Sequence, residues 1–229
     1  MKALITGASR GIGKAIAECL AKEAYELVLV ARSEADLITL AGELVEKGSP
    51  YVEYVAVDLS TSQGRADLIG SLEGDIDLLV NNIGLFHEAA ADQISSGVLH
   101  EQMCANVYPA IDLSHAVLDS MKAKSSGSIV FIGSIVSETN LAYAAAYTLT
   151  KSLLSNYVEM IREELKSSPI RISEIIPTAV NTSSWKGIEA PKDQFLQTTD
   201  IVEAFKSIIF AHPNVSVDRI QISSKILEK

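Results

Sequence analysis

The sequence predicts a single α/β domain in which a doubly wound, seven-stranded parallel sheet carries helices on both faces. Short apolar runs alternate with longer amphipathic stretches from one end of the chain to the other, which is the order typical of a parallel sheet. The runs are apolar at consecutive positions, as in residues 27–30, because helices are expected to cover both sides of each strand. A length of 229 residues suits one such domain, and no internal repeat or linker marks a boundary, so residues 1–229 are expected to fold together.

The expected elements follow this alternation in order. Apolar runs predict seven strands, the first of which leads directly into a glycine-rich loop, at 2–6, 26–31, 51–57, 78–81, 128–133, 171–176 and 215–222. Apolar residues spaced three or four apart predict helices between them, at 11–24, 34–47, 61–72, 101–122, 147–167 and 199–211. Residues 179–198 have no clear period and include Trp185 and Phe195. A loop of this length in a compact domain is typical of a lid or binding loop.

The composition indicates a small-molecule partner. The net charge of −10 and the isoelectric point near 4.9 disfavour binding to nucleic acid or to an anionic membrane, since both need clustered lysine and arginine. No apolar run approaches the roughly 20 residues that span a bilayer, and no export signal is visible at the start, so a cytoplasmic protein is expected. Cys19 and Cys104 are expected to be buried thiols. Neither they nor the histidines are expected to have a partner at metal-ligand spacing, so no metal site is expected.

The loop after the first strand predicts a phosphate site. It reads Thr6-Gly-Ala-Ser-Arg-Gly-Ile-Gly13 and leads into a helix. Glycine permits unusual φ angles and a close approach of the backbone to a pyrophosphate, whose charge the free N–H groups at the helix N-terminus would favour. A purely structural turn is the alternative, but the position between a strand and a helix favours a dinucleotide.

Three further residues predict a reaction centre. Tyr147 and Lys151 are four residues apart on an expected helix, so they share one face, and Ser134 ends a strand thirteen positions before Tyr147. Hydride arriving at a carbonyl carbon builds negative charge on oxygen, which Ser134 could stabilise and Tyr147 could protonate. A useful base form of a phenol needs its pKa to fall roughly 2 to 3 units from about 10, or about 3 to 4 kcal/mol. A lysine charge about 4 Å away supplies about 4 kcal/mol at an effective dielectric of 20.

These motifs together resemble the short-chain dehydrogenase/reductase family. TGASRGIG at 6–13, NNIG at 81–84 and the Ser134, Tyr147 and Lys151 set occur in family order and spacing over nearly the whole chain. The resemblance implies a Rossmann fold and an NADP(H)-dependent oxidoreductase acting on a carbonyl or secondary alcohol. The overall likeness is to small 3-oxoacyl-thioester and general carbonyl reductases.

The resemblance also implies roles for individual residues. Lys151 would bind the nicotinamide ribose, and Asn106 would hold a water that leads to this lysine, which makes Asn106 the fourth expected catalytic residue. Thr178 stands where the family usually has glycine, a substitution that would be costly at positive φ. The expected cofactor contacts are Gly7, Ser9, Arg10, Gly11, Ile12, Gly13, Arg32, Ser33, Asp58, Leu59, Asn82, Gly84, Tyr147, Lys151, Pro177, Val180 and Thr182.

The residues after the second strand favour NADP(H) over NAD(H). An NAD-binding chain would place an acidic residue there to bind the ribose hydroxyls, whereas this chain has Ala31-Arg32-Ser33. The planar donors of Arg32 suit a 2′-phosphate, and Arg10 could assist. Glu34 nearby and a merely solvated Arg32 keep NAD(H) as the alternative cofactor.

The sequence also indicates a substrate class and an assembly. A moderately apolar ketone or aldehyde is expected from the pocket walls Phe86, His87, Ile135, Val136, Tyr143 and Trp185. A non-catalytic NADP(H)-sensing protein is one alternative function. A sugar-nucleotide epimerase or dehydratase is another, although it usually needs a larger C-terminal domain. A homodimer or homotetramer is expected through the helices at 101–122 and 147–167. Val117, Leu118 and Met121 are expected to face outward and form the interface, with packing inside the chain as the alternative.

Overall fold

The computed structural model describes residues 1–187, 189–212 and 214–225. Its centre is one sheet whose seven strands are all parallel, in the order β3-β2-β1-β4-β5-β6-β7. The predicted fold class is therefore confirmed. The strands are β1 (Lys2–Thr6), β2 (Glu26–Ala31), β3 (Val52–Ala56), β4 (Leu78–Asn81), β5 (Ser128–Ile132), β6 (Arg171–Pro177) and β7 (Arg219–Ile222).

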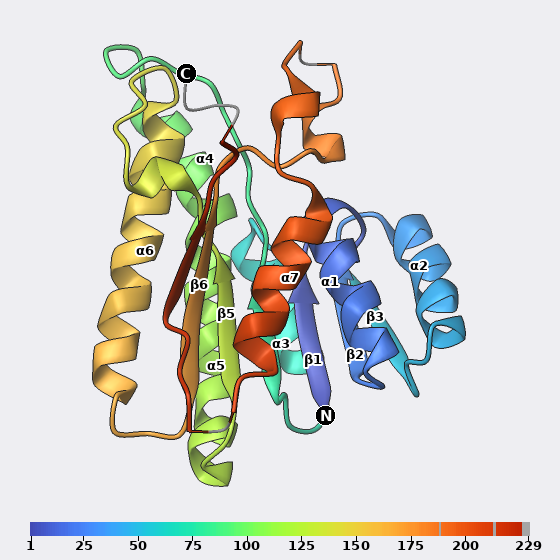
Figure 1. The fold of residues 1–229 in the computed structure, drawn as a ribbon. Coiled ribbons are helices and arrows are strands. Elements are labelled where there is room, and N and C mark those ends of the chain that lie inside the picture. The colour runs from blue at the N-terminus through green and yellow to red at the C-terminus, as the bar shows by residue number, and fades with distance from the viewer. Residues whose placement is uncertain (188, 213, 226–229) are drawn as a thin grey trace.

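Helices cover both faces of this sheet (Figure 1). One face packs against α1 (Gly11–Lys22), α2 (Glu34–Glu46) and α7 (Thr198–Ile209), and the other against α3 (Ser62–Ser71), α5 (Tyr108–Lys124) and α6 (Ala145–Leu165). The remaining elements are α4 (Ser96–Asn106) and the short 3-10 helices η1 (Ile135–Ser137), η2 (Ser183–Trp185) and η3 (Lys192–Gln194).

The two faces of the sheet bury two separate apolar cores. Neighbouring residues of a strand point to opposite sides. Leu4 of β1 and Leu79 of β4 accordingly join the core beneath α3, α5 and α6, while Ile5 and Val80 join the core beneath α1, α2 and α7. All four side chains are fully buried. This explains the continuous apolar runs in the sequence.

The predicted helix at 101–122 is wrong, because the chain forms two helices there. α4 ends at Asn106 and α5 begins at Tyr108, with a break at Val107. Pro109 has no N–H to donate to the carbonyl of Ala105, so the helical hydrogen-bond ladder cannot continue through it. The break leaves Asn106 at the end of a helix, where its side chain can turn toward the active-site edge.

The prediction that Val117, Leu118 and Met121 face outward is also wrong. All three are buried, at 2%, 6% and 0% exposure, in the core between α5 and the sheet. The predicted strand at 215–222 is too long as well. Only Arg219–Ile222 pairs with β6, in the register Glu174↔Arg219 to Pro177↔Ile222.

The topology creates one edge suited to binding. β1 and β4 are neighbours although they are not consecutive, so the strand order reverses between them, and ligands of such sheets bind at the carboxyl ends of the strands near this point. Figure 1 shows the segment between β6 and α7 above this same edge, the one toward which the arrow of β1 points. Among the described residues, no helix is both long and apolar enough to cross a membrane.

Candidate active site

The glycine loop is shaped by backbone that other residues would strain or block. Gly7 and Gly11 have φ angles of 62° and 57°, in the left-handed region. A Cβ on Gly13 would lie 2.3 Å from the carbonyl oxygen of Gly7. No side chain caps the start of α1, because Arg10 at the N-cap makes no side-chain hydrogen bond there. The first N–H groups of α1 thus suit the pyrophosphate of a dinucleotide.

Asn82 fastens this loop to the end of β4. Its Nδ2 donates to the carbonyl oxygens of Thr6 at 3.0 Å and Gly7 at 3.2 Å, and its backbone N–H donates to Oγ1 of Thr6 at 3.0 Å. The side-chain Nδ2 of Asn82 would also lie 2.6 Å from a Cβ on Gly13. The loop, β4 and the start of α1 therefore form one tightly packed unit.

The expected adenosine side lies beyond β2 and β3. Arg32 is exposed after β2, and Ser33 caps α2 by accepting from the N–H of Asp36 at 3.4 Å. The pKa of Asp58 is lowered, first by the backbone N–H of Ser60 and further by the hydroxyl of Ser60 and the charge of Arg32. The side chain of Leu59 lies in the core, so only its backbone is available to a ligand.

Ser134 and Tyr147 are brought together as expected from their spacing. Ser134 follows β5 in an extended conformation and caps η1, accepting from the N–H of Val136 at 3.4 Å. Tyr147 lies in the first turn of α6. Burial raises the pKa of Tyr147, and its hydrogen bond with Ser134 opposes that rise. The cost of burying a phenolate sets the direction of this shift, and the lowering of the pKa by Lys151 stays a prediction.

Lys151 lies beneath the tyrosine. Its side chain is 3% exposed, its Nζ donates to the carbonyl oxygen of Ile132 at 3.0 Å, and Nζ is 5.9 Å from the ring centroid of Tyr147. Burial lowers the pKa of Lys151 to about 8, while the charge of Glu174 raises it. The lysine therefore titrates close to neutrality and can exchange a proton.

Asn106 is 2% exposed and joins three segments of the site. Its Oδ1 accepts from the N–H of Leu85 at 2.6 Å, and its Nδ2 lies 3.0 Å from the carbonyl oxygen of Leu85 and 3.1 Å from Oγ1 of Thr150. A Cβ on Gly84 would lie 3.6 Å from Nζ of Lys151 and 3.9 Å from Oδ1 of Asn106. Gly84 thus lies close to both groups that the relay would join.

The segment after β6 reaches back to the glycine loop. Thr182 packs on it, since a Cβ on Gly11 would lie 3.2 Å from its methyl group. Pro177 ends β6, and Val180 forms an isolated bridge with Leu196. The concern about strain at Thr178 does not arise, because the positive φ angles among the described non-glycine residues are at two other positions, Ala24 and Ser125.

The hydroxyl of Thr178 has a structural use instead. It accepts from the N–H of Ser224 at 3.2 Å, next to the backbone bond from Thr178 N to the carbonyl oxygen of Ile222 at 3.0 Å. Threonine therefore ties the segment after β7 to the end of β6.

The predicted pocket walls divide into two groups. Phe86 packs edge-on against Tyr147, with 5.3 Å between ring centroids, and lies at the reaction centre. Trp185 instead packs on Phe195 at 4.8 Å and donates from Nε1 to the carbonyl oxygen of Val180 at 3.0 Å. Val136 is buried, whereas Tyr143 is 54% exposed. The expected lid at 179–198 includes η2 and η3, and residue 188 lies outside the described residues.

Several residues of this site carried no recognised signal in the sequence. Thr150 bonds to Asn106, and Gln102 accepts from Nδ2 of Asn106 at 3.1 Å while being fully buried. Glu174 interrupts the apolar run of β6, which was the available signal for a special role.

One of the two cysteines differs from expectation. Cys19 is buried, but Cys104 is half-buried and its Sγ lies 3.5 Å from Nε2 of His100, so these two residues do meet. A metal site needs more ligands than this pair. Within the described part of the chain, no group of three or more His, Cys, Asp or Glu residues could hold a metal ion.

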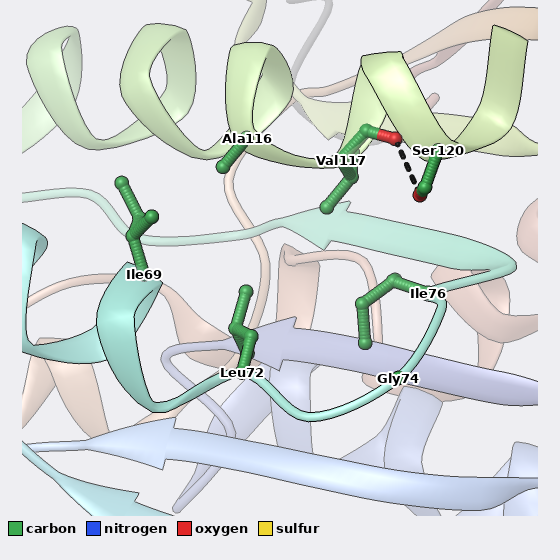
Figure 2. Close-up of a pocket in the computed structure, with 7 residues that line it drawn as sticks. All are labelled: Ile69, Leu72, Gly74, Ile76, Ala116, Val117 and Ser120. Carbon is green, nitrogen blue, oxygen red and sulfur yellow. Dashed lines mark hydrogen bonds between the residues drawn. The ribbon is translucent and has the colours of Figure 1, made fainter. Parts of the chain in front are cut away.

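A separate cavity of about 160 Å³ lies away from the site (Figure 2). Ile69, Leu72 and Ile76 face Val117 of α5 across it, at the amino end of β4. The expected catalytic residues lie instead at the carboxyl ends of the strands. The cavity is therefore not part of the candidate active site.

Comparison with known proteins places this geometry in a family. The family model for short chain dehydrogenases matches residues 1–193. An uncharacterised oxidoreductase of Bacillus subtilis, YmfI, is 34% identical over 185 residues, which cover 79% of this chain and 75% of that protein. The 3-oxoacyl-[acyl-carrier-protein] reductase FabG of Vibrio harveyi is 28% identical over 81% of this chain and 76% of that protein.

The solved structures agree. An alcohol dehydrogenase from Thermococcus sibiricus, complexed with 5-hydroxy-NADP, has a TM-score of 0.90 and 30% identity, over 100% of this chain and 98% of that one. The predicted family and enzyme class are thereby confirmed. The chain belongs to the short-chain dehydrogenase family of oxidoreductases.

Proposed function

We propose that this protein is an NADPH-dependent reductase of carbonyl compounds. The observation that carries the proposal is that Tyr147 contacts Ser134 and lies close to the buried Lys151. The glycine loop adds a backbone that residues with side chains would strain or block. Because burial raises the pKa of Tyr147, the phenol is protonated at neutral pH, as a proton donor must be.

The residues divide the chemistry among them. NADPH, when bound, supplies the hydride to the carbonyl carbon. Ser134 donates a hydrogen bond to the carbonyl oxygen as negative charge builds there, and Tyr147 gives that oxygen its proton. Lys151, with a pKa near 8, returns a proton to the phenolate, and Asn106 orients the path by which Lys151 is replenished.

The cofactor choice rests on Arg32 and Arg10. Both side chains are exposed, Arg10 in the glycine loop and Arg32 directly after β2, and no acidic residue ends β2. A guanidinium binds a phosphate in a planar, bidentate way. The relative from Thermococcus sibiricus was solved with an NADP derivative, which supports the same choice here.

Replacing Arg32 with alanine is expected to weaken NADPH specifically. Losing charge-assisted hydrogen bonds to a 2′-phosphate should raise KM for NADPH about 10-fold or more, with KM for NADH within about 2-fold of the wild type. Steady-state kinetics with both cofactors measures this. Lys122→Ala removes an equal charge from the far end of α5 and should leave both values unchanged. An equal change for NADPH and NADH in Arg32→Ala would contradict the assignment.

For the substrate, we propose a moderately apolar ketone or aldehyde, with 3-oxoacyl thioesters as the first class to test. The aromatic ring of Phe86 beside Tyr147 supports an apolar neighbour for the carbonyl, and the likeness to the Vibrio harveyi reductase supports the thioester. The test is NADPH oxidation, followed by absorbance, against ketones, aldehydes and acetoacetyl thioesters. Turnover supports the proposal. Saturable NADPH binding without turnover of any class would favour a sensing protein instead.

We further propose a cytoplasmic homodimer formed through α6. Leu149, Leu153 and Met160 share one face of this helix and are 50%, 41% and 70% exposed. They replace the buried residues of α5 that the sequence had suggested. Light scattering should give twice the chain mass of 24.6 kDa, and Met160→Glu should shift this toward the monomer. A wild-type monomer would contradict the dimer.

A further inference from the structure

Glu174 is a carboxylate in the middle of an apolar strand. It belongs to β6, it has no exposed surface, and the strand residues Ile172, Ile175 and Ile176 are buried core residues. Burying a charged group without compensation is costly, so an apolar residue would be more stable at a position with only a packing role. The residues around Glu174 should therefore explain why a carboxylate is buried there.

The carboxylate is only partly satisfied by the groups around it. Its Oε2 accepts from Oγ of Ser155 at 3.0 Å and lies 3.7 Å from Nε of Arg219. Arg219 in turn pairs with Glu138, directly after η1. Among the described residues, Oε1 has no hydrogen-bond partner. Structural hydrogen bonding alone does not account for a charge at this place.

Glu174 lies against both elements that carry the reaction. Ser155 is one helical turn beyond Lys151 on α6, and Nζ of Lys151 bonds to the carbonyl oxygen of Ile132 at the end of β5. Gly133 follows Ile132 and precedes Ser134. A Cβ on Gly133 would lie 2.5 Å from Oε1 of Glu174, so the backbone leading to Ser134 packs directly on the carboxylate.

We propose that Glu174 is a positioning residue of the active site, whose buried carboxylate holds Lys151 in its cationic form and supports the backbone that presents Ser134. The inference rests on the proposed role of Lys151 as the proton source for Tyr147. It adds a charged group that acts on the lysine and contacts the residue before Ser134.

The surrounding charges are consistent with this role. The described charged groups that act on Glu174 are Lys151 and Arg162 from α6 and Arg219 from β7. Burial raises the pKa of Glu174, while the bond from Ser155 and these three cations oppose the rise. Burial lowers the pKa of Lys151 to about 8 against the pull of Glu174. Without the carboxylate, the lysine pKa must fall further.

The rate of reduction is expected to depend on pH through the charge of Lys151. Reduction needs cationic Lys151, so its rate falls as pH rises through the lysine pKa. In Glu174→Gln, which keeps the shape of the side chain, the descending limb of kcat/KM should move down by about one pH unit. The rate should stay near the wild-type value at pH 6 and be about 10-fold lower at pH 9.

Two further variants separate electrostatics from structure. Glu174→Val suits a buried strand and also removes the charge, so its limb should move as in Glu174→Gln even if the amide folds poorly. Ser155→Ala removes one hydrogen bond but leaves the carboxyl group in place, so its limb should move less than that of either Glu174 variant. Thermal unfolding of each variant shows that the comparison is made on folded protein.

The outcomes are distinct. A wild-type limb in both Glu174 variants, or a loss of rate that is equal at every pH, would overturn the positioning role while leaving the reductase intact. A wild-type protein without NADPH-dependent turnover would overturn the proposed function, and this inference with it.

Discussion

Tyr147→Phe is expected to lower kcat for carbonyl reduction by about 10²- to 10⁴-fold, the usual contribution of a positioned general acid. The ring and its edge-on contact with Phe86 remain, so the loss isolates the hydroxyl that bonds to Ser134. NADPH binding, measured by fluorescence titration, should change little because the glycine loop is untouched. A variant that bound NADPH but did not turn over would assign the proton to Tyr147.

Tyr157→Phe is the matched control. It removes a hydroxyl from the same helix, ten residues along, where the phenol packs against Phe131. Its activity should equal that of the wild type. If Tyr147→Phe kept more than about a tenth of the wild-type kcat, the proton would have another source, and the mechanism would be wrong.

Gly13→Ala is expected to abolish tight cofactor binding. The added methyl group would lie 2.3 Å from the carbonyl oxygen of Gly7 and 2.6 Å from Nδ2 of Asn82. The first neighbour is backbone, so the loop itself must open to make room. Overpacking of this kind costs about 1 to 3 kcal/mol of folding free energy. A comparable loss of about 1.4 kcal/mol or more at the phosphate site would weaken NADPH binding at least about 10-fold.

The control for this change is Gly42→Ala. Gly42 lies in α2, and nothing lies within 4 Å of a Cβ placed there. Alanine should leave NADPH binding unchanged and raise the free energy of unfolding by up to about 1 kcal/mol, since glycine is a poor helix former. Calorimetric titration and chemical unfolding of the two variants measure both effects. Wild-type NADPH affinity in a folded Gly13→Ala protein would show that the loop does not form the phosphate site as proposed.

The sequence was most informative where one local pattern determines one structure. Continuous apolar runs predicted strands buried on both faces, and the structure confirms the all-parallel sheet. The spacing of Tyr147 and Lys151 predicted a shared helix face, and both lie in α6 with Nζ 5.9 Å from the ring centroid. The glycine motif predicted unusual φ angles, which Gly7 and Gly11 adopt.

The sequence was less informative where contacts distant along the chain decide. The contacts of Asn106 with Leu85 and Thr150 join segments far apart in the sequence, so they could not be predicted from the residues around Asn106. The buried face of α5 could not be predicted from its own residues, because nearly every apolar side chain of this helix suits either the core or an interface. The pKa of Tyr147 required knowing its burial, which no spacing reveals.

The role of Glu174 also depends on contacts that are distant along the chain. A charged residue within the apolar run 172–176 was visible, but its meaning depends on Ser155, Arg219 and Gly133, which reach it from two other elements and from the end of β5. A buried charge in a predicted strand is therefore a reason to ask which catalytic group lies beside it.

The most direct test of the proposed function follows the hydride itself. The wild-type protein is incubated with NADPH that carries deuterium at the transferable position of nicotinamide C4 and with the best carbonyl substrate, and the alcohol product is analysed by mass spectrometry. Reduction at the Ser134, Tyr147 and Lys151 site predicts one deuterium on the carbinol carbon per NADPH consumed, with none formed by Tyr147→Phe above background. An unlabelled product, or NADPH binding with no alcohol formed from any carbonyl, would contradict a reductase.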